Sequence, residues 1–193
     1  RLRWLDRAGR EVGQIGGAAP YRNPRISPNG NRVAVELVDA LGNRDIWVMD
    51  VARGVPVRFT FDAGRDASPV WSADGRHLAW QGTSATYLKD ASGSGREAIL
   101  RDEPWIPDDW LPDDSGLLLH PGGTRQIWLL PLKGDQTPRP ILDGRVITTH
   151  ARVSPDGKWV AFVNTDSGRF EIFIRNFATA SGRRQVSSHG GIQ

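Results

Sequence analysis

The sequence contains no cysteine, only three lysines, and no long hydrophobic run. Without cysteine there is no disulfide framework and no thiolate chemistry. No apolar stretch approaches the ~20 residues of a membrane span, and residues 1–6 lack the apolar core of a signal peptide. We therefore expect no direct membrane insertion by this chain. It begins without methionine and ends without an obvious tail, so we expect it to be a piece of something longer.

Positive charge comes almost entirely from arginine, and the net charge is only +3 over 193 residues. Basic and acidic residues are interspersed, as in Arg44-Asp45, Arg65-Asp66 and Arg101-Asp102. This pattern does not form the continuous basic stripe that nucleic acid requires. We predict no nucleic-acid partner.

Helical periodicity is also missing. No 11-residue window carries apolar residues at i, i+3, i+4 and i+7 between caps, and strand-type alternation prevails throughout. The sequence predicts an all-β fold.

A strand–turn–strand motif recurs along the chain. Residues 153–162 read Val-Ser-Pro-Asp-Gly-Lys-Trp-Val-Ala-Phe, with copies at 26–35 and 71–80 and a degraded copy at 110–119. The copies start at Ile26, Trp71, Trp110 and Val153, which lie 45, 39 and 43 residues apart. Repeats of roughly 40–45 residues with about four strands each are typical of β-propeller blades.

The repeat predicts one partial propeller of about four and a half blades. Residues 1–16 form an outer half blade, and four full blades follow at 21–60, 66–100, 105–142 and 148–187. Residues 188–193 approach the next blade. A propeller that lacks blades exposes sheet edges, so we expect self-association or a partly open ring.

Several segments resemble known families. The repeat at 153–162 and the segment Asp-Ile-Trp-Val-Met-Asp at 45–50 are similar to TolB-type propellers. The segments at 4–10, 21–30 and 45–54 resemble, more particularly, the C-terminal propeller of bacterial serine/threonine protein kinases. The resemblance implies a sensor domain in the periplasm or otherwise outside the cytoplasm, joined to a kinase by a membrane span.

Catalytic motifs do not appear in the chain itself. There is no glycine-rich phosphate loop and no His-Arg-Asp catalytic loop. There is also no Gly-x-Ser-x-Gly elbow, and the four histidines lack metal-ligand spacing. We predict no catalytic residue, no metal site and no cofactor.

Two groups of conspicuous residues are assigned to structure. Asn and Asp before glycine form turns through their own backbone, so Asn29, Asp74, Asp113 and Asp156 are predicted turn formers rather than metal ligands. Large aromatic rings on third strands and before the turns are predicted to pack between blades. These are Trp47, Tyr87, Trp128, Phe173, Trp71 and Trp110. Trp105 breaks the register and is predicted to make an exposed contact.

The best candidate site lies where the innermost strands of the blades begin, at one rim of the central channel. Asn23, Ser68, Pro107 and His150 occupy aligned positions there. Polar groups gather where a sheet core would favour apolar ones. The predicted ligand-binding residues are Arg22, Arg25, Asp66, Trp105, Asp108, Asp109, His150 and Arg152. Convergent polar groups are typical of a binding site, but inter-blade salt bridges around a water-filled channel explain them equally well.

Three functions fit this pattern. The first is a non-catalytic binding or sensing module that presents the rim to a protein, a peptide or a small ligand. The second is the accessory propeller of a serine peptidase of the prolyl oligopeptidase kind, which gates a hydrolase domain. The third is a scaffold, either a TolB-like periplasmic protein-interaction scaffold or a pure scaffold whose rim binds nothing. For the pure scaffold, Arg25→Ala and Arg152→Ala change stability but no interaction.

Overall fold

A computed structural model describes residues 1–39, 41–123, 126–142 and 148–191. Within these ranges the regular elements are all strands, and neighbouring strands pair antiparallel. The chain forms two compact units, residues 1–71 with 75–102, and residues 103–193 with 72–74. Two predicted features, the start of a third strand at Arg125 and the end of the approach to a next blade at Ile192 and Gln193, lie outside the described residues.

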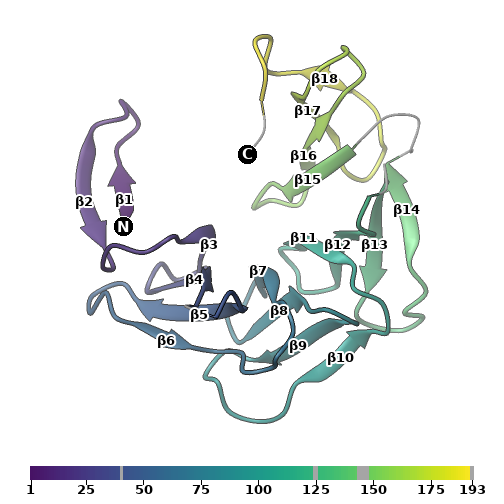
Figure 1. Cartoon of the computed structure of the whole chain (residues 1–193). Helices are drawn as coiled ribbons and strands as arrows, with labels where there is room; N and C mark the ends of the chain where they lie inside the picture. Colours follow the sequence, from purple (N-terminus) through teal and green to yellow (C-terminus); the bar gives the residue numbers. More distant parts are fainter. Residues whose placement is uncertain (40, 124–125, 143–147, 192–193) are drawn as a thin grey trace. The chain divides into compact units, whose positions relative to one another are not determined.

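The first unit contains a hairpin and two four-stranded sheets (Figure 1). The hairpin consists of β1 (Leu2–Leu5) and β2 (Glu11–Ile15). One sheet consists of β3 (Arg22–Ile26), β4 (Arg32–Val38), β5 (Arg44–Asp50) and β6 (Pro56–Arg58). The other consists of β7 (Ala67–Trp71), β8 (His77–Gln81), β9 (Thr86–Asp90) and β10 (Ala98–Arg101).

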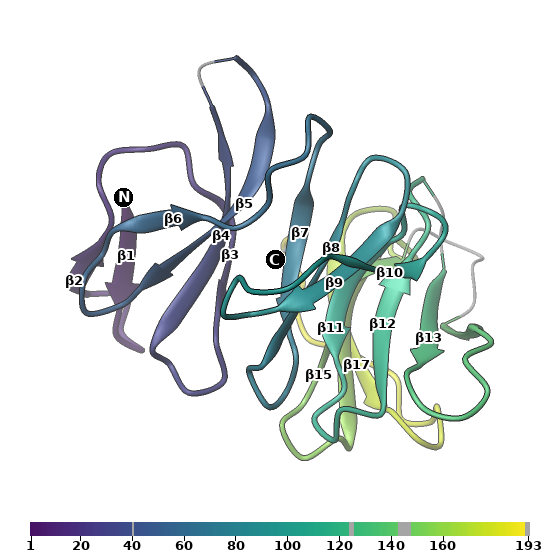
Figure 2. The ribbon, with the colours of Figure 1, turned by 90° about the horizontal axis from the view of Figure 1, so that it is seen from below.

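The second unit contains two further four-stranded sheets (Figure 2). The first consists of β11 (Ile106–Trp110), β12 (Gly116–His120), β13 (Ile127–Pro131) and β14 (Arg139–Leu142). The second consists of β15 (Thr148–Val153), β16 (Trp159–Asn164), β17 (Glu171–Asn176) and β18 (Arg184–Gln185).

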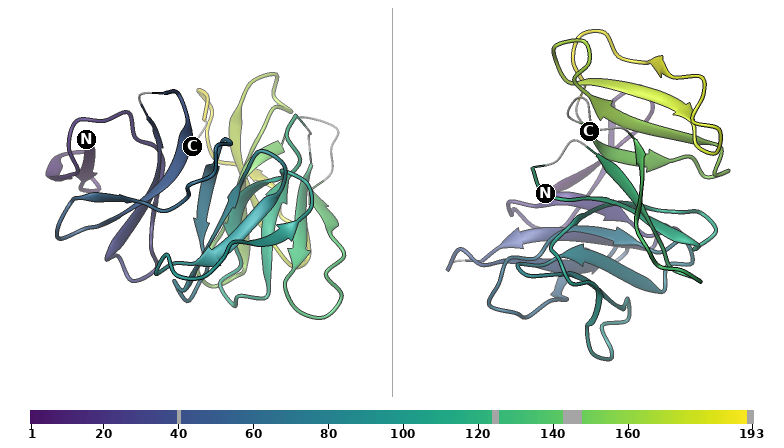
Figure 3. Two further views of the ribbon diagram at one scale, coloured as in Figure 1. Left: turned by 60° about the horizontal axis from the view of Figure 1, so that its bottom comes forward. Right: turned by 90° about the vertical axis from the view of Figure 1, so that its right-hand side faces the viewer.

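Each four-stranded sheet is an up-and-down meander in which consecutive strands are hydrogen-bonded neighbours. The strands are visibly twisted (Figure 3), as the handedness of the backbone requires. The predicted all-β fold class with four-stranded antiparallel blades is confirmed. We call the four sheets blades 1 to 4 in chain order.

The turns between the first two strands of each blade behave as predicted. In blade 4, the N–H of Gly157 donates to Ser154 O at 2.8 Å, and φ of Gly157 is 70°. Blade 3 has Asp114 at the position of this glycine, with φ of 55° and the matching N–H bond to Leu111 O at 3.0 Å. Aspartate tolerates left-handed geometry better than most residues. The divergent sequence of blade 3 therefore keeps the same turn.

The Asn and Asp side chains of these turns accept hydrogen bonds within their own turn. Asn29 Oδ1 accepts the N–H of Asn31 at 3.1 Å, and Asp156 Oδ1 accepts that of Lys158 at 3.1 Å. Asp113 accepts the N–H of Ser115 at 3.0 Å, and Asp74 accepts the Ser72 hydroxyl at 2.7 Å. The prediction that all four form turns is confirmed.

Every innermost strand contains an irregularity in its pairing with the second strand. In blades 1, 2 and 4 this bulge contains a residue with positive φ, Asn23 at 46°, Ser68 at 56° and His150 at 56°. Blade 3 has Pro107 at the aligned position, and the proline ring holds φ negative. Bulges re-aim side chains at the ends of strands, so the candidate rim is built on irregular backbone.

Apolar side chains fill the space between adjacent sheets of each unit. In the first unit, Trp71 and Trp80 from blade 2 pack with Ile46 from blade 1, with Tyr87 against the cluster. In the second unit, Phe173 from blade 4 packs with Ile127 of blade 3. Trp71 and Trp110 are 7% and 8% exposed. The predicted packing between blades is confirmed for Trp71, Tyr87 and Phe173, whereas Trp47 and Trp128 are half-buried.

Candidate functional site

Three of the predicted rim residues lie in the first unit, in different environments. Arg22 is exposed at the start of β3, Arg25 is half-buried later in the same strand, and Asp66 is buried just before β7. Arg25 contributes its backbone oxygen to the neighbouring blade, because Trp71 Nε1 donates to it at 2.9 Å.

Asp66 connects blades 1 and 2 through both backbone and side chain. Its N–H donates to Arg44 O at 2.7 Å, and its Oδ1 accepts the indole N–H of Trp80 at 3.0 Å. Burial raises the pKa of the Asp66 carboxyl from 3.8 to about 6, although the Thr60 hydroxyl and Trp80 indole bond to it. The nearby charges of Glu97 and Asp62 raise it further.

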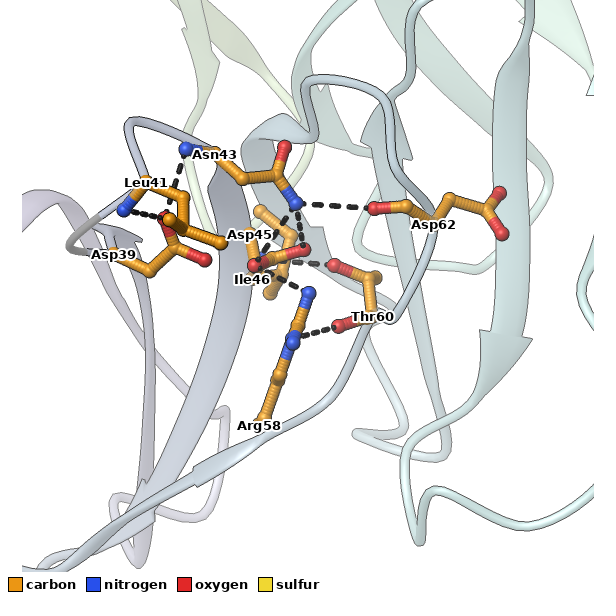
Figure 4. Close-up of polar contacts among 8 residues, drawn as sticks. All are labelled: Asp39, Leu41, Asn43, Asp45, Ile46, Arg58, Thr60 and Asp62. Carbon is orange, nitrogen blue, oxygen red and sulfur yellow. Dashed lines mark hydrogen bonds and ion pairs between the residues drawn. The ribbon is translucent and has the colours of Figure 1, made fainter.

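A second buried carboxylate, Asp45 of blade 1, was not predicted; Figure 4 shows its polar contacts. Arg58 Nη2 lies 2.8 Å from Asp45 Oδ2, while Arg58 Nε donates to Thr60 O at 2.9 Å. The amide of Asn43 reaches from Asp45 to the backbone oxygen of Asp62, at 3.4 and 3.1 Å respectively. The ion pair anchors the segment after β6 to the start of β5.

Blade 4 repeats this arrangement with different residues. Glu171 at the start of β17 is fully buried, Arg169 Nε lies 2.9 Å from its carboxylate, and the Ser187 hydroxyl donates to it. Ser187 Oγ also accepts the N–H of Ile172 at 2.8 Å, as Thr60 accepts that of Ile46 at 3.0 Å. An acidic residue before isoleucine, with a hydroxyl 15 or 16 residues later, is the sequence signal for this pair.

Glu36 on β4 is the other buried acid that the sequence patterns missed. Its side chain accepts the amide of Asn23 at 2.5 Å and the backbone N–H of Ser68 at 2.6 Å, and Arg44 lies 3.4 Å away. Asn23 and Ser68 are the bulge residues of blades 1 and 2. Glu36 thereby holds the bulges of two adjacent innermost strands.

Five predicted rim residues lie in the second unit, and three of them come together. Asp108 is 3% exposed, and its Oδ2 lies 2.6 Å from Nδ1 of His120, itself 7% exposed on β12. Asp109 Oδ2 accepts the backbone N–H of Val153 at 2.8 Å. Arg152 Nη1 donates to the backbone oxygen of Asp108. These bonds join β11 to β15, the innermost strands of blades 3 and 4.

Trp105 and His150 make further contacts of their own. The Trp105 ring is half-buried against Trp128, with centroids 5.4 Å apart and planes at 62°. His150 is exposed, and its Nδ1 lies 2.9 Å from the hydroxyl of Thr149. Trp105 therefore packs on its own blade as well as facing solvent. His150 is the accessible imidazole beside the cluster.

Within the described residues, the imidazole of His120 is paired with Asp108, and the hydroxyl that contacts an imidazole in this region is that of Thr149, beside His150. The described residues also contain no group of three acidic or histidine side chains placed to hold a metal ion. In addition, these residues form no helix long and apolar enough to cross a membrane.

Known proteins share this fold. No protein-family model matches the chain. It is 28% identical over 108 residues to a protein named as the uncharacterized peptidase YuxL of Bacillus subtilis. The matched region covers 50% of this chain and 16% of that protein. The structure of a putative TolB from Agrobacterium tumefaciens matches with a TM-score of 0.74 at 21% identity, over 92% of this chain and 69% of that one.

A chain of a nidogen–laminin complex also matches with a TM-score of 0.74, at 13% identity, over 97% of this chain and 74% of that chain. At such identities the likeness shows the fold alone. The chain therefore has a TolB-like β-propeller fold, and it spans about a sixth of the length of the curated relative that it matches.

Proposed function

We propose that this propeller is a non-catalytic binding module that contacts a protein or peptide through its innermost strands. The observation that carries the proposal is the state of Arg152. Its Nη1 bonds two backbone oxygens, of Asp108 and Ala151, whereas its Nη2 is buried and has no hydrogen-bond partner among the described residues. A buried guanidinium nitrogen without a partner is costly. An acceptor from a bound peptide removes that cost once the guanidinium turns and brings Nη2 to the surface.

The surroundings of Arg152 support the same proposal. Asp109 and Arg152 place an acid and a cation on the adjacent innermost strands β11 and β15, and the imidazole of His150 lies on β15 as well. Convergent polar groups on a rigid scaffold are suited to orienting a ligand. The matched chain from a nidogen–laminin complex supports a protein partner in general, because that propeller-like chain comes from a protein complex.

Selection from a random peptide library displayed on phage tests this proposal. Selected peptides are resynthesised with a fluorophore, and their affinities are measured by anisotropy for the wild type and for Arg152→Gln. We expect Arg152→Gln to weaken binding at least tenfold, and Arg184→Gln on the exposed β18 to leave it unchanged. A library without binders, or binders indifferent to Arg152→Gln, would overturn the proposal. Thermal unfolding of both variants verifies that they are folded.

We further propose that the module is the sensor of a bacterial membrane serine/threonine kinase and lies outside the cytoplasm. The support is the resemblance of residues 4–10, 21–30 and 45–54 to kinase-associated propellers. The alternative is an accessory propeller of a serine peptidase, and the Bacillus relative with a peptidase name favours it. The reading frame around this chain decides between them. Kinase and membrane-span sequences support the first, and an α/β-hydrolase domain supports the second.

A further inference from the structure

A cavity of about 540 Å³ lies between blades 3 and 4 of the second unit, away from the cluster around Arg152. Strand β14 of blade 3 forms one wall, and strands β16 and β17 with the segment before β18 form the other. This volume lies within the ~300–1,000 Å³ of small-molecule sites in proteins. The cavity is therefore large enough for a ligand of moderate size.

One part of the lining is apolar and rigid. Leu142 and Phe162 are 4% and 3% exposed, and both belong to the hydrophobic core of the second unit. Ile141 packs against the same core. Side chains held in a packed core keep their rotamers, so this part presents a preformed surface to the apolar body of a ligand.

The other part of the lining carries two arginines and one carboxylate. Arg183 lies with Cζ 4.3 Å from the ring centroid of Phe173, and its Nη2 donates to Asn164 Oδ1 at 3.2 Å. Its Nη1 lies 2.5 Å from Asp166 Oδ2. Arg175 donates to the backbone oxygen of Ile141 across the two blades. Among the described residues, the lining holds two arginines and one acid.

The pairing of Arg183 with Asp166 is exchangeable. The two side chains are 42% and 44% exposed, and ion pairs with this exposure contribute little to stability. Arg183 keeps its place without Asp166, because the Phe173 ring and Asn164 also hold it. An incoming anion can therefore take over the Nη1 of Arg183 at small cost.

We propose that this cavity binds a small organic carboxylate with an apolar body. The carboxylate pairs with Arg183, assisted by the field of Arg175, and the body lies against Phe162, Leu142 and Ile141. A planar guanidinium matches a carboxylate bidentately. The lining does not include Asp108, Asp109 or Arg152, so the site does not depend on the peptide-binding function.

The first test is ligand-observed NMR with a panel of aromatic and aliphatic carboxylates, each matched to its neutral primary amide. We expect binders among the carboxylates, with the matched amides at least fivefold weaker. A panel without carboxylate binders, or equal binding of acids and amides, would refute the proposal.

The second test uses two substitutions with opposite expected effects on the affinity for the best carboxylate. Arg183→Gln should weaken binding at least fivefold. Asp166→Asn should tighten it about twofold to fivefold, because the competing carboxylate is removed. Arg184→Gln, an exposed neighbour on β18, serves as control and should change nothing. Loss of affinity in Asp166→Asn would contradict the proposal. Arg152→Gln should also have no effect, which separates this site from the peptide-binding surface.

Discussion

The carboxylate of Glu36 accepts the backbone N–H of Ser68 at 2.6 Å, so a fully buried acid of blade 1 holds the bulge of blade 2. Ser68 has φ of 56°, a left-handed conformation that costs energy in a residue with a β-carbon. The same acid accepts the amide of Asn23, the bulge residue of its own blade. Two irregular innermost strands of the first unit are thus fixed by one side chain.

Replacing Glu36 should destabilise the first unit strongly. Glu36→Ala leaves the Ser68 N–H and the Asn23 amide without their acceptor, and each buried unsatisfied group costs about 1–3 kcal/mol. We expect a loss of about 3 kcal/mol in the free energy of unfolding, measured with urea. Glu36→Gln retains one acceptor and should lose less. Glu11→Gln on exposed β2 is the control, and a loss in Glu36→Ala as small as in that control would contradict the assignment.

Asp66 should make stability fall as pH rises. Its folded pKa is raised to about 6 from 3.8, so the protein favours the protonated carboxyl. The stabilisation that protonated Asp66 contributes to the folded protein is fully present below the pKa of this carboxyl in the unfolded chain. It is lost as pH rises through about 6. Asp66→Asn cannot ionise but still accepts the Trp80 N–H. Relative to the wild type, this variant should gain about 1–3 kcal/mol between pH 4 and pH 7.5.

Urea unfolding of both proteins at four pH values across this range measures the difference. Using the difference between the two proteins removes the titration of the other carboxylates, including Asp62 and Glu97, which face Asp66. Parallel pH profiles would show that Asp66 titrates normally.

Asp114 should tolerate asparagine but not alanine. It holds φ of 55° in the blade 3 turn, and its Oδ1 accepts the N–H of Ala73 at 2.7 Å. Alanine loses this bond and disfavours left-handed geometry, which together cost about 1–2 kcal/mol. Asparagine keeps both features and should stay within about 0.5 kcal/mol. Thermal unfolding compares the two, with Gly157→Ala as a reference for backbone strain alone. Equal stability of the alanine and asparagine variants would be inconsistent with this turn.

Arg32 should not be replaceable by lysine. Its Nη1 and Nη2 donate to Ala91 O at 2.6 Å and Gly75 O at 3.0 Å, and Cζ lies 4.7 Å from the Trp71 ring centroid. A lysine ammonium cannot reproduce this planar fork. We expect Arg32→Lys to cost about 1–2 kcal/mol in urea unfolding. The exposed Arg53→Lys should cost less than about 0.5 kcal/mol, and similar losses for the two variants would argue against the bridge.

Local patterns predicted the strands and turns well. The copies of the repeat at 26–35 and 153–162 each contain the predicted tight turn followed by a strand, because turn residues and the apolar residues after them act on near neighbours. The fourth strand of blade 1 ends at Arg58, although the apolar sequence continues to Phe59. The difference has a physical cause. Beyond Arg58 the Thr60 hydroxyl, rather than the backbone, accepts the N–H of Ile46.

The sequence by itself determined the repeat, the all-β class and the turn residues, because each depends on neighbours a few positions apart. Only the tertiary structure decided that Asp66 is buried beside Trp80 and that Glu36 reaches Ser68. It also decided that Arg152 bonds the backbone of Asp108, whereas Trp105 packs on Trp128. These partners are 14 to 44 residues apart in the chain. Which polar groups meet across blades depends on how sheets pack, and no local pattern encodes that packing.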